Sequence, residues 1–210
     1  MTGEPGMRVI AIDGPVGSGK STIARAVARR LGMDHLETGA MYRAVAYAAL
    51  LSGMDVTAAG ADLARLAAAL DLEMGERVLL HGSDVTDELR TPEVTRVSSV
   101  VAADRGVRLE LVRRQRTWAA LRFGGVIEGR DIGSVVFPDA VLKVFLTATK
   151  LERARRRAEE DPGDVARRDA ADSSRTLSPL VVAEGALVID TTDRTVDDIV
   201  DEIVAAFPAA

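Results

Sequence analysis

Residues 11–32, AIDGPVGSGKSTIARAVARRLG, decide the fold class of this 210-residue chain. Gly14, Gly19, Lys20 and Ser21 fill the pattern G-x-x-x-x-G-K-[ST], which forms a loop around the phosphates of a nucleoside triphosphate. The pattern by itself indicates only that phosphates are held. It leaves open whether the terminal phosphate goes to water, driving a switch or a motor, or to a second substrate.

The segments on either side of the motif give it the context that phosphate binding requires. The apolar, β-branched run MRVIAI at residues 7–12 predicts a buried strand. After the motif, apolar residues recur every four positions and predict a helix over residues 20–31, which Gly32 would end. A strand, a glycine-rich loop and a helix in this order argue against a chance match.

The chemistry of such a loop assigns roles to its residues. Backbone N–H groups and the positive end of the helix dipole face the phosphates, and glycines let the backbone approach them closely. Lys20 would reach the β- and γ-phosphates, and the Ser21 hydroxyl would join the shell of a Mg²⁺ ion. We assign to ATP binding Gly14, Pro15, Val16, Gly17, Ser18, Gly19, Lys20, Ser21 and Thr22.

Composition narrows the class of protein. Hydrophobic residues make up 47% of the chain and charged residues 28%, as in an ordinary globular protein. The formal net charge of -5 argues against a protein coated in nucleic acid. The chain has no cysteine, which excludes a disulfide framework and a thiolate nucleophile. Because apolar runs fall short of a membrane span and residues 1–7 lack signal-peptide features, we expect a cytoplasmic protein without membrane partners. We also expect a monomer, since no apolar patch is readable from the sequence.

Strand-like and helix-like segments alternate along the rest of the chain, which predicts an α/β fold with a doubly wound parallel sheet in one domain. Thr91 is a plausible N-cap, with Pro92 at the first helical position. We expect helices over residues 39–53, 58–70, 149–161 and at the C-terminus, two helices between 91 and 123 that meet near 104–106, a hairpin over 70–86, and strands within 124–133, 139–148 and 186–192.

The rest of the sequence favours a kinase over other proteins that use this loop. A switch GTPase would carry an Asn-Lys-x-Asp stretch, which the chain lacks. A motor ATPase would carry an acidic residue after an apolar strand to serve Mg²⁺. Glu128 is a candidate for that residue, but its strand runs directly into Arg130 and Asp131.

Arginine placement also points to transfer between two phosphorylated substrates. Donor and acceptor bring several negative charges together, and arginine is suited to clamp and neutralise them. The arginines concerned are Arg43, Arg108, Arg130, Arg153, Arg155, Arg156, Arg157, Arg167, Arg168 and Arg175. For the run ERARRRAEED at residues 152–161, a solvated helix face with ion pairs is an equal alternative.

Six motifs along the chain resemble those of bacterial cytidylate kinases. They are IDGPVGSGKST (12–22), ETGAMYRAVA (37–46), DVTDELRTPEV (84–94), VRRQR (112–116), IEGRDIGSVVFPDA (127–140) and DSSRTLSPL (172–180). The resemblance implies a P-loop NTPase fold with a parallel five-stranded sheet, a monophosphate-binding insertion and a short lid. It divides the chain into a core (1–38, 102–152 and 176–210), a monophosphate-binding region (39–101) and a lid (153–175).

The resemblance also implies an activity and a set of site residues. The activity is transfer of the γ-phosphoryl group of ATP, with Mg²⁺, to CMP or dCMP, with Lys20, Arg130 and Arg175 as catalytic residues. The residues implied to bind CMP are Thr38, Tyr42, Arg43, Ser99, Arg108, Arg130, Asp131, Asp172 and Arg175. An aspartate that accepts from the cytosine amine and an arginine that donates to the ring acceptors would complement that base.

The chain departs from the family pattern at three places. Glu37 and Thr38 precede GA where relatives commonly have Asp-Ser or Asp-Thr, the hairpin is trimmed, and the lid lacks most of a helix before DSSR. Two alternatives remain open at this point. One is a kinase with AMP, UMP or dTMP as acceptor, and the other is a regulatory module that hydrolyses ATP slowly.

Overall fold

The computed structural model describes residues 6–156 and 180–208. The chain forms two compact units. Unit 1 comprises residues 1–36 and 116–210, and unit 2 comprises residues 37–115. The division into core, monophosphate-binding region and lid stays a prediction, and most of the lid segment lies outside the described residues.

A five-stranded sheet organises unit 1. Its strands follow the order β2 (His35–Glu37), β6 (Gly124–Gly129), β1 (Arg8–Asp13), β7 (Leu142–Thr147) and β8 (Leu187–Asp190). Strand β1 pairs in parallel with both β6 and β7, and β7 pairs in parallel with β8. The predicted five-stranded parallel sheet is therefore confirmed, with the strand before the phosphate-binding motif at its centre.

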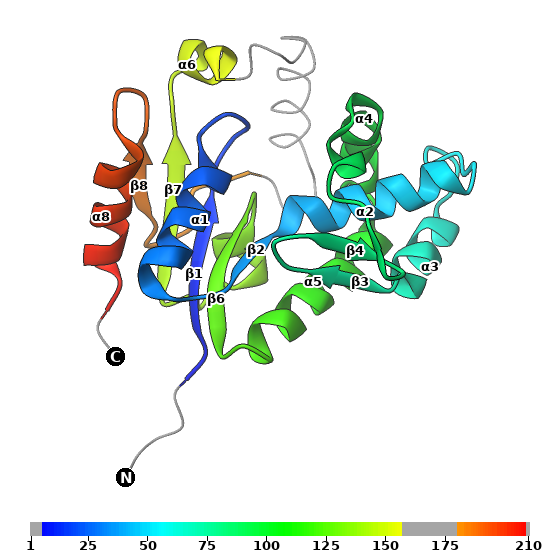
Figure 1. The fold of residues 1–210 in the computed structure, drawn as a ribbon, viewed down its shortest axis with the longest axis horizontal. Coiled ribbons are helices and arrows are strands. Elements are labelled where there is room, and N and C mark those ends of the chain that lie inside the picture. Colours follow the sequence, from blue (N-terminus) through cyan, green and yellow to red (C-terminus); the bar gives the residue numbers. More distant parts are fainter. Residues whose placement is uncertain (1–5, 157–179, 209–210) are drawn as a thin grey trace. The chain divides into compact units, whose positions relative to one another are not determined.

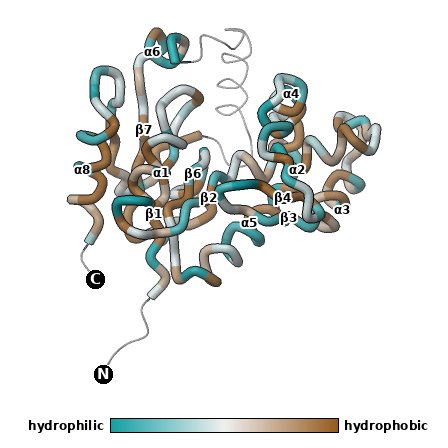
Figure 2. The backbone as a smooth tube through the Cα atoms, in the orientation of Figure 1, coloured by the Kyte–Doolittle hydropathy of each residue, from teal (hydrophilic) through white to brown (hydrophobic). Residues whose placement is uncertain are grey.

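Helices α1 (Lys20–Leu31) and α8 (Val196–Ala206) share one hydrophobic core with this sheet. Figure 1 shows α1 in front of β1 and α8 beside β8, and Figure 2 shows hydrophobic stretches in the sheet and on α8. Ile10 and Ile12 of β1 pack with Ile23 of α1 and Ile199 of α8, all at most 2% exposed. The helix predicted over residues 20–31 has these bounds, and Gly32 ends it in the left-handed conformation.

Unit 2 is mostly helical. It contains α2 (Thr38–Leu51), α3 (Ala61–Ala69), the short helix η1 (Glu88–Arg90), α4 (Pro92–Val101) and the first part of α5 (Arg105–Ala120). The Thr91 side chain accepts a hydrogen bond from the Val94 backbone N–H, as expected of an N-cap. The predicted hairpin is present as β3 (Leu72–Met74) and β4 (Val78–Leu80), to which β5 (Ser83–Asp84) adds a third antiparallel strand.

Three features complete unit 1. The charged helix expected from residue 149 is described as α6 (Lys150–Arg155). Strand β2 was not predicted, and the glycine-rich turn after β6 contains a π-helical turn, η2 (Ile132–Val136).

Among the residues that the structure describes, no helix has the length and apolar character that a bilayer crossing needs.

Candidate nucleotide-binding site

The phosphate loop, residues 14–21, connects the end of β1 to the start of α1. Gly14 has φ 151° and Gly19, the residue that precedes α1, has φ 87°. A Cβ atom on Gly14 would lie 2.1 Å from the carbonyl oxygen of Leu146 in β7. Glycine is therefore required at residue 14 both by the backbone angle and by the closeness of the neighbouring strand.

Lys20 and Ser18 fold back onto the loop that carries them. The Lys20 Nζ donates to the Pro15 carbonyl oxygen at 2.7 Å, and the Ser18 Oγ donates to the same oxygen at 2.9 Å. Lys20 is 7% exposed. The ammonium group is thus held at the loop, as its predicted role toward phosphates requires.

Ser21 lies beside an acidic side chain at the end of β6. Its Oγ donates to Glu128 Oε2 at 2.9 Å, and the other carboxylate oxygen lies 3.2 Å from His35 Nε2. The parallel register that pairs Ile12 with Glu128 brings this carboxylate next to the phosphate loop. From the sequence, Glu128 was a candidate for the acidic residue that serves Mg²⁺ in a motor ATPase. In the structure its carboxylate lies next to Ser21, the residue expected to bind the metal.

The donor atoms at Ser21 fit a hard divalent cation. A serine hydroxyl and a carboxylate are both oxygen ligands of the kind that Mg²⁺ prefers. No group of three His, Cys, Asp or Glu side chains within residues 6–156 and 180–208 could hold a metal ion. A Mg²⁺ ion at Ser21 would also take waters and phosphate oxygens of the nucleotide as ligands, as Mg²⁺ usually does in nucleotide sites.

Asp13, the last residue of β1, fixes the start of the turn after β6. Its Oδ1 accepts from the Ile132 backbone N–H at 2.9 Å and its Oδ2 accepts from the Gly133 N–H at 2.8 Å. Burial raises the pKa of Asp13 from 3.8 to about 6, although these two N–H groups oppose the increase. The nearby Asp131 carboxylate raises this pKa further, and Lys20 lowers it. Sequence reasoning missed this residue because Asp13 precedes the phosphate-binding pattern.

Two of the unit 1 residues assigned to CMP, Arg130 and Asp131, lie in that turn. Asp131 is 6% exposed, and its backbone carbonyl accepts from the Val135 N–H at 2.9 Å as η2 begins. The Arg130 Nη1 donates to the Gly129 carbonyl oxygen at 3.3 Å. The side chain of Asp13 and the backbone of η2 thus hold the turn that carries both residues.

The unit 2 residues assigned to CMP come from α2, α4 and α5. Thr38 begins α2 and is 4% exposed, and Ser99 lies half-buried in α4. Arg108 of α5 is 6% exposed and its guanidinium lies 5.8 Å from the centre of the Tyr42 ring. Arg43 forms an ion pair with Glu37. In unit 2, Arg108 thus lies near the Tyr42 ring of α2, and Arg43 of the same helix is paired with Glu37.

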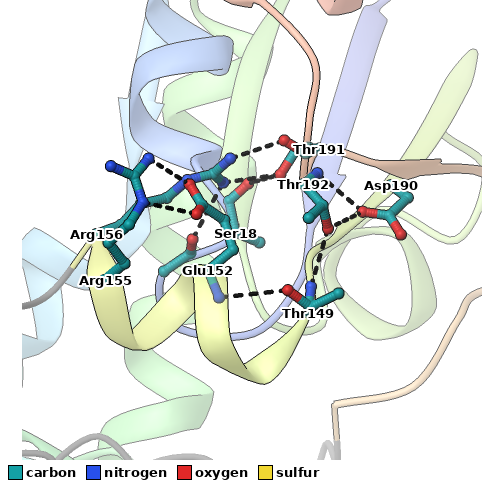
Figure 3. Close-up of polar contacts among 9 residues, drawn as sticks. Ser18, Thr149, Glu152, Arg155, Arg156, Asp190, Thr191 and Thr192 are labelled. Atoms are coloured by element: carbon teal, nitrogen blue, oxygen red, sulfur yellow. Dashed lines mark hydrogen bonds and ion pairs between the residues drawn. The ribbon is translucent and has the colours of Figure 1, made fainter.

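The run of arginines in α6 divides into two kinds of side chain. Arg155 pairs with Glu152 on the exposed face of the helix, as the solvated-face alternative predicts. Its hydrogen bond is the main reason why the pKa of Glu152 is lowered to about 2. Arg153, in contrast, donates to the Val16 carbonyl of the phosphate loop at 3.0 Å, and Arg156 reaches Thr191 after β8 (Figure 3). Asp172, Arg175, Arg157, Arg167 and Arg168 lie outside the described residues.

Comparison with known proteins identifies the family. A model of the cytidylate kinase family matches residues 10–209. The cytidylate kinase of Bacillus subtilis strain 168 is 42% identical over 214 residues, covering 94% of this chain and 95% of that protein. The cytidylate kinase of Desulforamulus reducens is 46% identical over 215 residues, with coverage of 94% and 95%.

The chain also resembles part of a longer protein. The bifunctional pantoate ligase/cytidylate kinase of Parasynechococcus marenigrum is 46% identical over 228 residues, covering 100% of this chain and 44% of that protein. The chain thus spans less than half the length of this bifunctional relative.

Solved structures support the fold alone. The Thermus thermophilus protein TT1252 matches with a TM-score of 0.52 at 20% identity, covering 97% of this chain and 100% of that chain. A gluconokinase from Sinorhizobium meliloti matches with a TM-score of 0.51 at 15% identity, covering 96% and 91%. Both likenesses agree with the P-loop fold predicted from the sequence.

The family match covers the phosphate loop. The match begins within β1, includes the whole loop and continues through α8. The matching family model is that of the cytidylate kinases. This chain belongs to the cytidylate kinase family.

Proposed function

We propose that the chain transfers the γ-phosphoryl group of ATP directly to the phosphate of CMP or dCMP. The observation that carries this proposal is the family match over residues 10–209, which includes a complete phosphate loop. Relatives of similar length carry the name cytidylate kinase. The acceptor distinguishes this proposal from a phosphate loop that delivers its phosphoryl group to water.

The donor side of the proposal rests on the loop and its neighbours. Loop N–H groups would bind the ATP phosphates, and Lys20 would exchange its contact with Pro15 for phosphate oxygens. Ser21 would hold Mg²⁺, with Glu128 accepting from Ser21 or from a metal-bound water. Mg²⁺, when bound, would offset the charge on the β- and γ-phosphates.

The acceptor side of the proposal rests on the resemblance, supported by the character of the residues. Asp131 and Arg108 are charged yet each only 6% exposed, which suits groups that read a base by hydrogen bonds. Asp131 would accept from the cytosine amine, and Arg108 would donate to the ring acceptors. Thr38, Arg43 and Arg130 would bind the CMP phosphate, with Ser99 at the base and Tyr42 toward the ribose.

Phosphoryl transfer in this scheme depends on positioning and charge. Arg130 and Lys20 would neutralise charge that spreads over the transferred group, and the in-line approach of the CMP oxygen would need both substrates held at once. Arg175 and Asp172 would complete the site from the lid segment, a role inferred only from the resemblance. The cytoplasmic, monomeric state expected from the sequence stays a prediction.

A coupled assay for ADP release with a panel of monophosphates tests the function. We expect rapid turnover with CMP and dCMP and slow turnover with AMP, UMP, dTMP or no acceptor. Faster turnover with AMP, UMP or dTMP than with CMP would show that the acceptor is that monophosphate and not CMP. Turnover that no acceptor accelerates would indicate a module that hydrolyses ATP.

A further inference from the structure

Three consecutive carbonyl groups of the phosphate loop accept hydrogen bonds from side chains outside the loop. The Arg153 Nη1 donates to the Val16 oxygen at 3.0 Å. The Thr191 Oγ1 donates to the Ser18 oxygen at 3.1 Å, a contact between residues that are 2% and 0% exposed. Between them, the Arg156 Nη1 makes a longer contact of 3.4 Å with the Gly17 oxygen. The carbonyl side of this part of the loop is therefore occupied by protein groups.

The direction of these carbonyls determines where the loop N–H groups point. A trans peptide group is planar, so its C=O and the N–H of the following residue point in opposite directions. Contacts to the oxygens of Val16, Gly17 and Ser18 therefore turn the N–H groups of the next residues away from Arg153, Arg156 and Thr191. Those N–H groups belong to Gly17, Ser18 and Gly19, and the Ser18 N–H makes a contact of 3.4 Å with the Pro15 carbonyl oxygen that a phosphate oxygen would replace.

Arg156 and Thr191 support each other in this arrangement (Figure 3). The Arg156 Nη1 donates to Thr191 Oγ1 at 2.8 Å and its Nη2 donates to the Thr191 carbonyl at 2.7 Å. A hydroxyl group can accept and donate at once, so the Thr191 Oγ1 accepts from Arg156 and also donates to the Ser18 carbonyl oxygen. The Arg156 Nε donates to Glu152 Oε1 at 2.8 Å, which keeps the guanidinium oriented.

Close packing leaves this part of the loop little freedom to move. A Cβ atom on Gly17 would lie 2.9 Å from the Arg153 carbonyl oxygen, so α6 lies directly against the loop. Thr191 is fixed in turn, because its backbone N–H donates to the Thr147 carbonyl of β7 at 2.9 Å. Helix α6 and the segment after β8 thus pack against the loop on the side of these carbonyl groups.

We propose that Arg153, Arg156 and Thr191 are positioning residues for the donor phosphates. They hold the loop carbonyls on one side so that the loop N–H groups converge on the other side before ATP arrives. Preorganised donors bind better because the ordering does not have to occur during binding. This inference rests on the proposed function only in that the loop binds the phosphates of ATP.

Two neighbouring residues provide matched controls. Arg155 lies on the same helix, and within the part of the chain that the structure describes its hydrogen bonds go to Glu152. Thr192 is adjacent to Thr191, but its side chain donates to Asp190 Oδ1 and accepts from the Thr149 N–H. Substitution of either residue leaves the contacts to the phosphate loop in place.

The experiment compares binding of MgATP and of inorganic tripolyphosphate, which has no base or ribose, by calorimetry. We expect Arg156→Ala to raise both dissociation constants about 10-fold and Thr191→Val to raise both about 3- to 10-fold, the range for one lost hydrogen bond. Thr191→Ser should restore binding because it keeps the hydroxyl group. Arg155→Ala and Thr192→Val should stay within about 2-fold, and the KM for CMP should change little in every variant.

Three results would overturn the proposal. If Arg156→Ala weakened MgATP but not tripolyphosphate, Arg156 would contact the base or ribose instead. If Thr191→Val and Thr191→Ser bound tripolyphosphate equally, the hydroxyl would not position the loop. If Arg155→Ala matched Arg156→Ala, the effect would be one of general charge. Failure of the wild-type chain to phosphorylate CMP would reject the proposed function, whereas these comparisons need only binding.

Discussion

At the end of the phosphate loop, Lys20 is held by its contact with the Pro15 carbonyl, ready to exchange that oxygen for those of a triphosphate. We expect Lys20→Ala to lower kcat by about 100-fold or more, the usual effect of removing a preorganised charge from a transition state. The measurement is the steady-state rate with CMP, together with thermal unfolding of the variant. A variant that folds and turns over at a near-normal rate would contradict the assigned role.

Asp13 differs from Lys20 because its charge works against folding. Burial raises its pKa from 3.8 to about 6, so between these values the folded chain keeps a proton that the unfolded chain has lost. The contribution of Asp13 to stability therefore falls as pH rises through this window and is constant above it. The full difference is about 3 kcal/mol, since one pKa unit corresponds to about 1.4 kcal/mol.

Asp13→Asn makes this cost measurable, because an amide does not titrate. We expect the free energy of unfolding of the wild type, minus that of Asp13→Asn, to decrease between about pH 4 and pH 6 and then to level off. Urea unfolding at several pH values gives this difference while effects of other carboxylates cancel. A difference that does not vary with pH would show that burial does not raise the Asp13 pKa.

At the scale of elements, the fold depends on how closely the loop approaches β7. Ala at residue 14 would place a methyl group 2.1 Å from the Leu146 oxygen, in a backbone conformation with φ 151°. We expect Gly14→Ala to lower the free energy of unfolding by more than about 2 kcal/mol, because strain and overlap add. Urea denaturation measures the loss.

Gly32 provides the control for this prediction. It also has a positive φ, 63°, but no atom lies within 4 Å of the position of an added Cβ. Gly32→Ala should therefore show the conformational cost alone, about 1–2 kcal/mol. Equal losses for the two variants would mean that contact with β7 contributes nothing.

Elements with strong local signals were predictable from the sequence. The apolar run before the phosphate loop predicted β1, and the apolar residues spaced four apart after it predicted α1. Thr91 followed by Pro92 marked the start of α4, because a threonine cap and a proline in the first turn act within a few residues. These signals depend on neighbours in the chain and need no tertiary contact.

Features that depend on distant residues were not predictable in the same way. Strand β2 has three residues, too few for a periodic pattern, and it exists because β6 pairs beside it. The contact of Ser21 with Glu128 joins residues 107 positions apart and requires the parallel register of β1 and β6. The support of the loop by Arg156 and Thr191 likewise joins two separate segments that no sequence pattern links.

At the scale of the whole molecule, acceptor choice is the part of the proposed function that the family resemblance assigns to residues of both compact units. Arg108 belongs to unit 2 and Asp131 to unit 1, and the family resemblance assigns both to cytosine. Family membership could be predicted because six motifs occur in order along the chain. The order of the motifs does not tell whether Arg108 and Asp131 recognise cytosine. Measuring the preference of variants for CMP over UMP tests that role.

Asp131→Asn provides that test. The substitution should keep the contacts that Val135 and Val136 make with the backbone oxygen of Asp131 in this turn. An amide can present either a donor or an acceptor, so it would accept CMP weakly and penalise UMP less than a carboxylate does. Loss of the charge-assisted hydrogen bond to the cytosine amine would cost about 1–2 kcal/mol.

The ratio of kcat/KM for CMP to that for UMP should therefore fall about 10-fold or more in Asp131→Asn, since each 1.4 kcal/mol corresponds to a factor of ten. The alternative is that Asp131 only orients Arg130, its neighbour in the turn. In that case the variant would weaken every monophosphate equally, because the phosphate is common to all of them. Both kcat/KM values measured on one folded variant decide the matter, and an unchanged ratio would remove Asp131 from the base site.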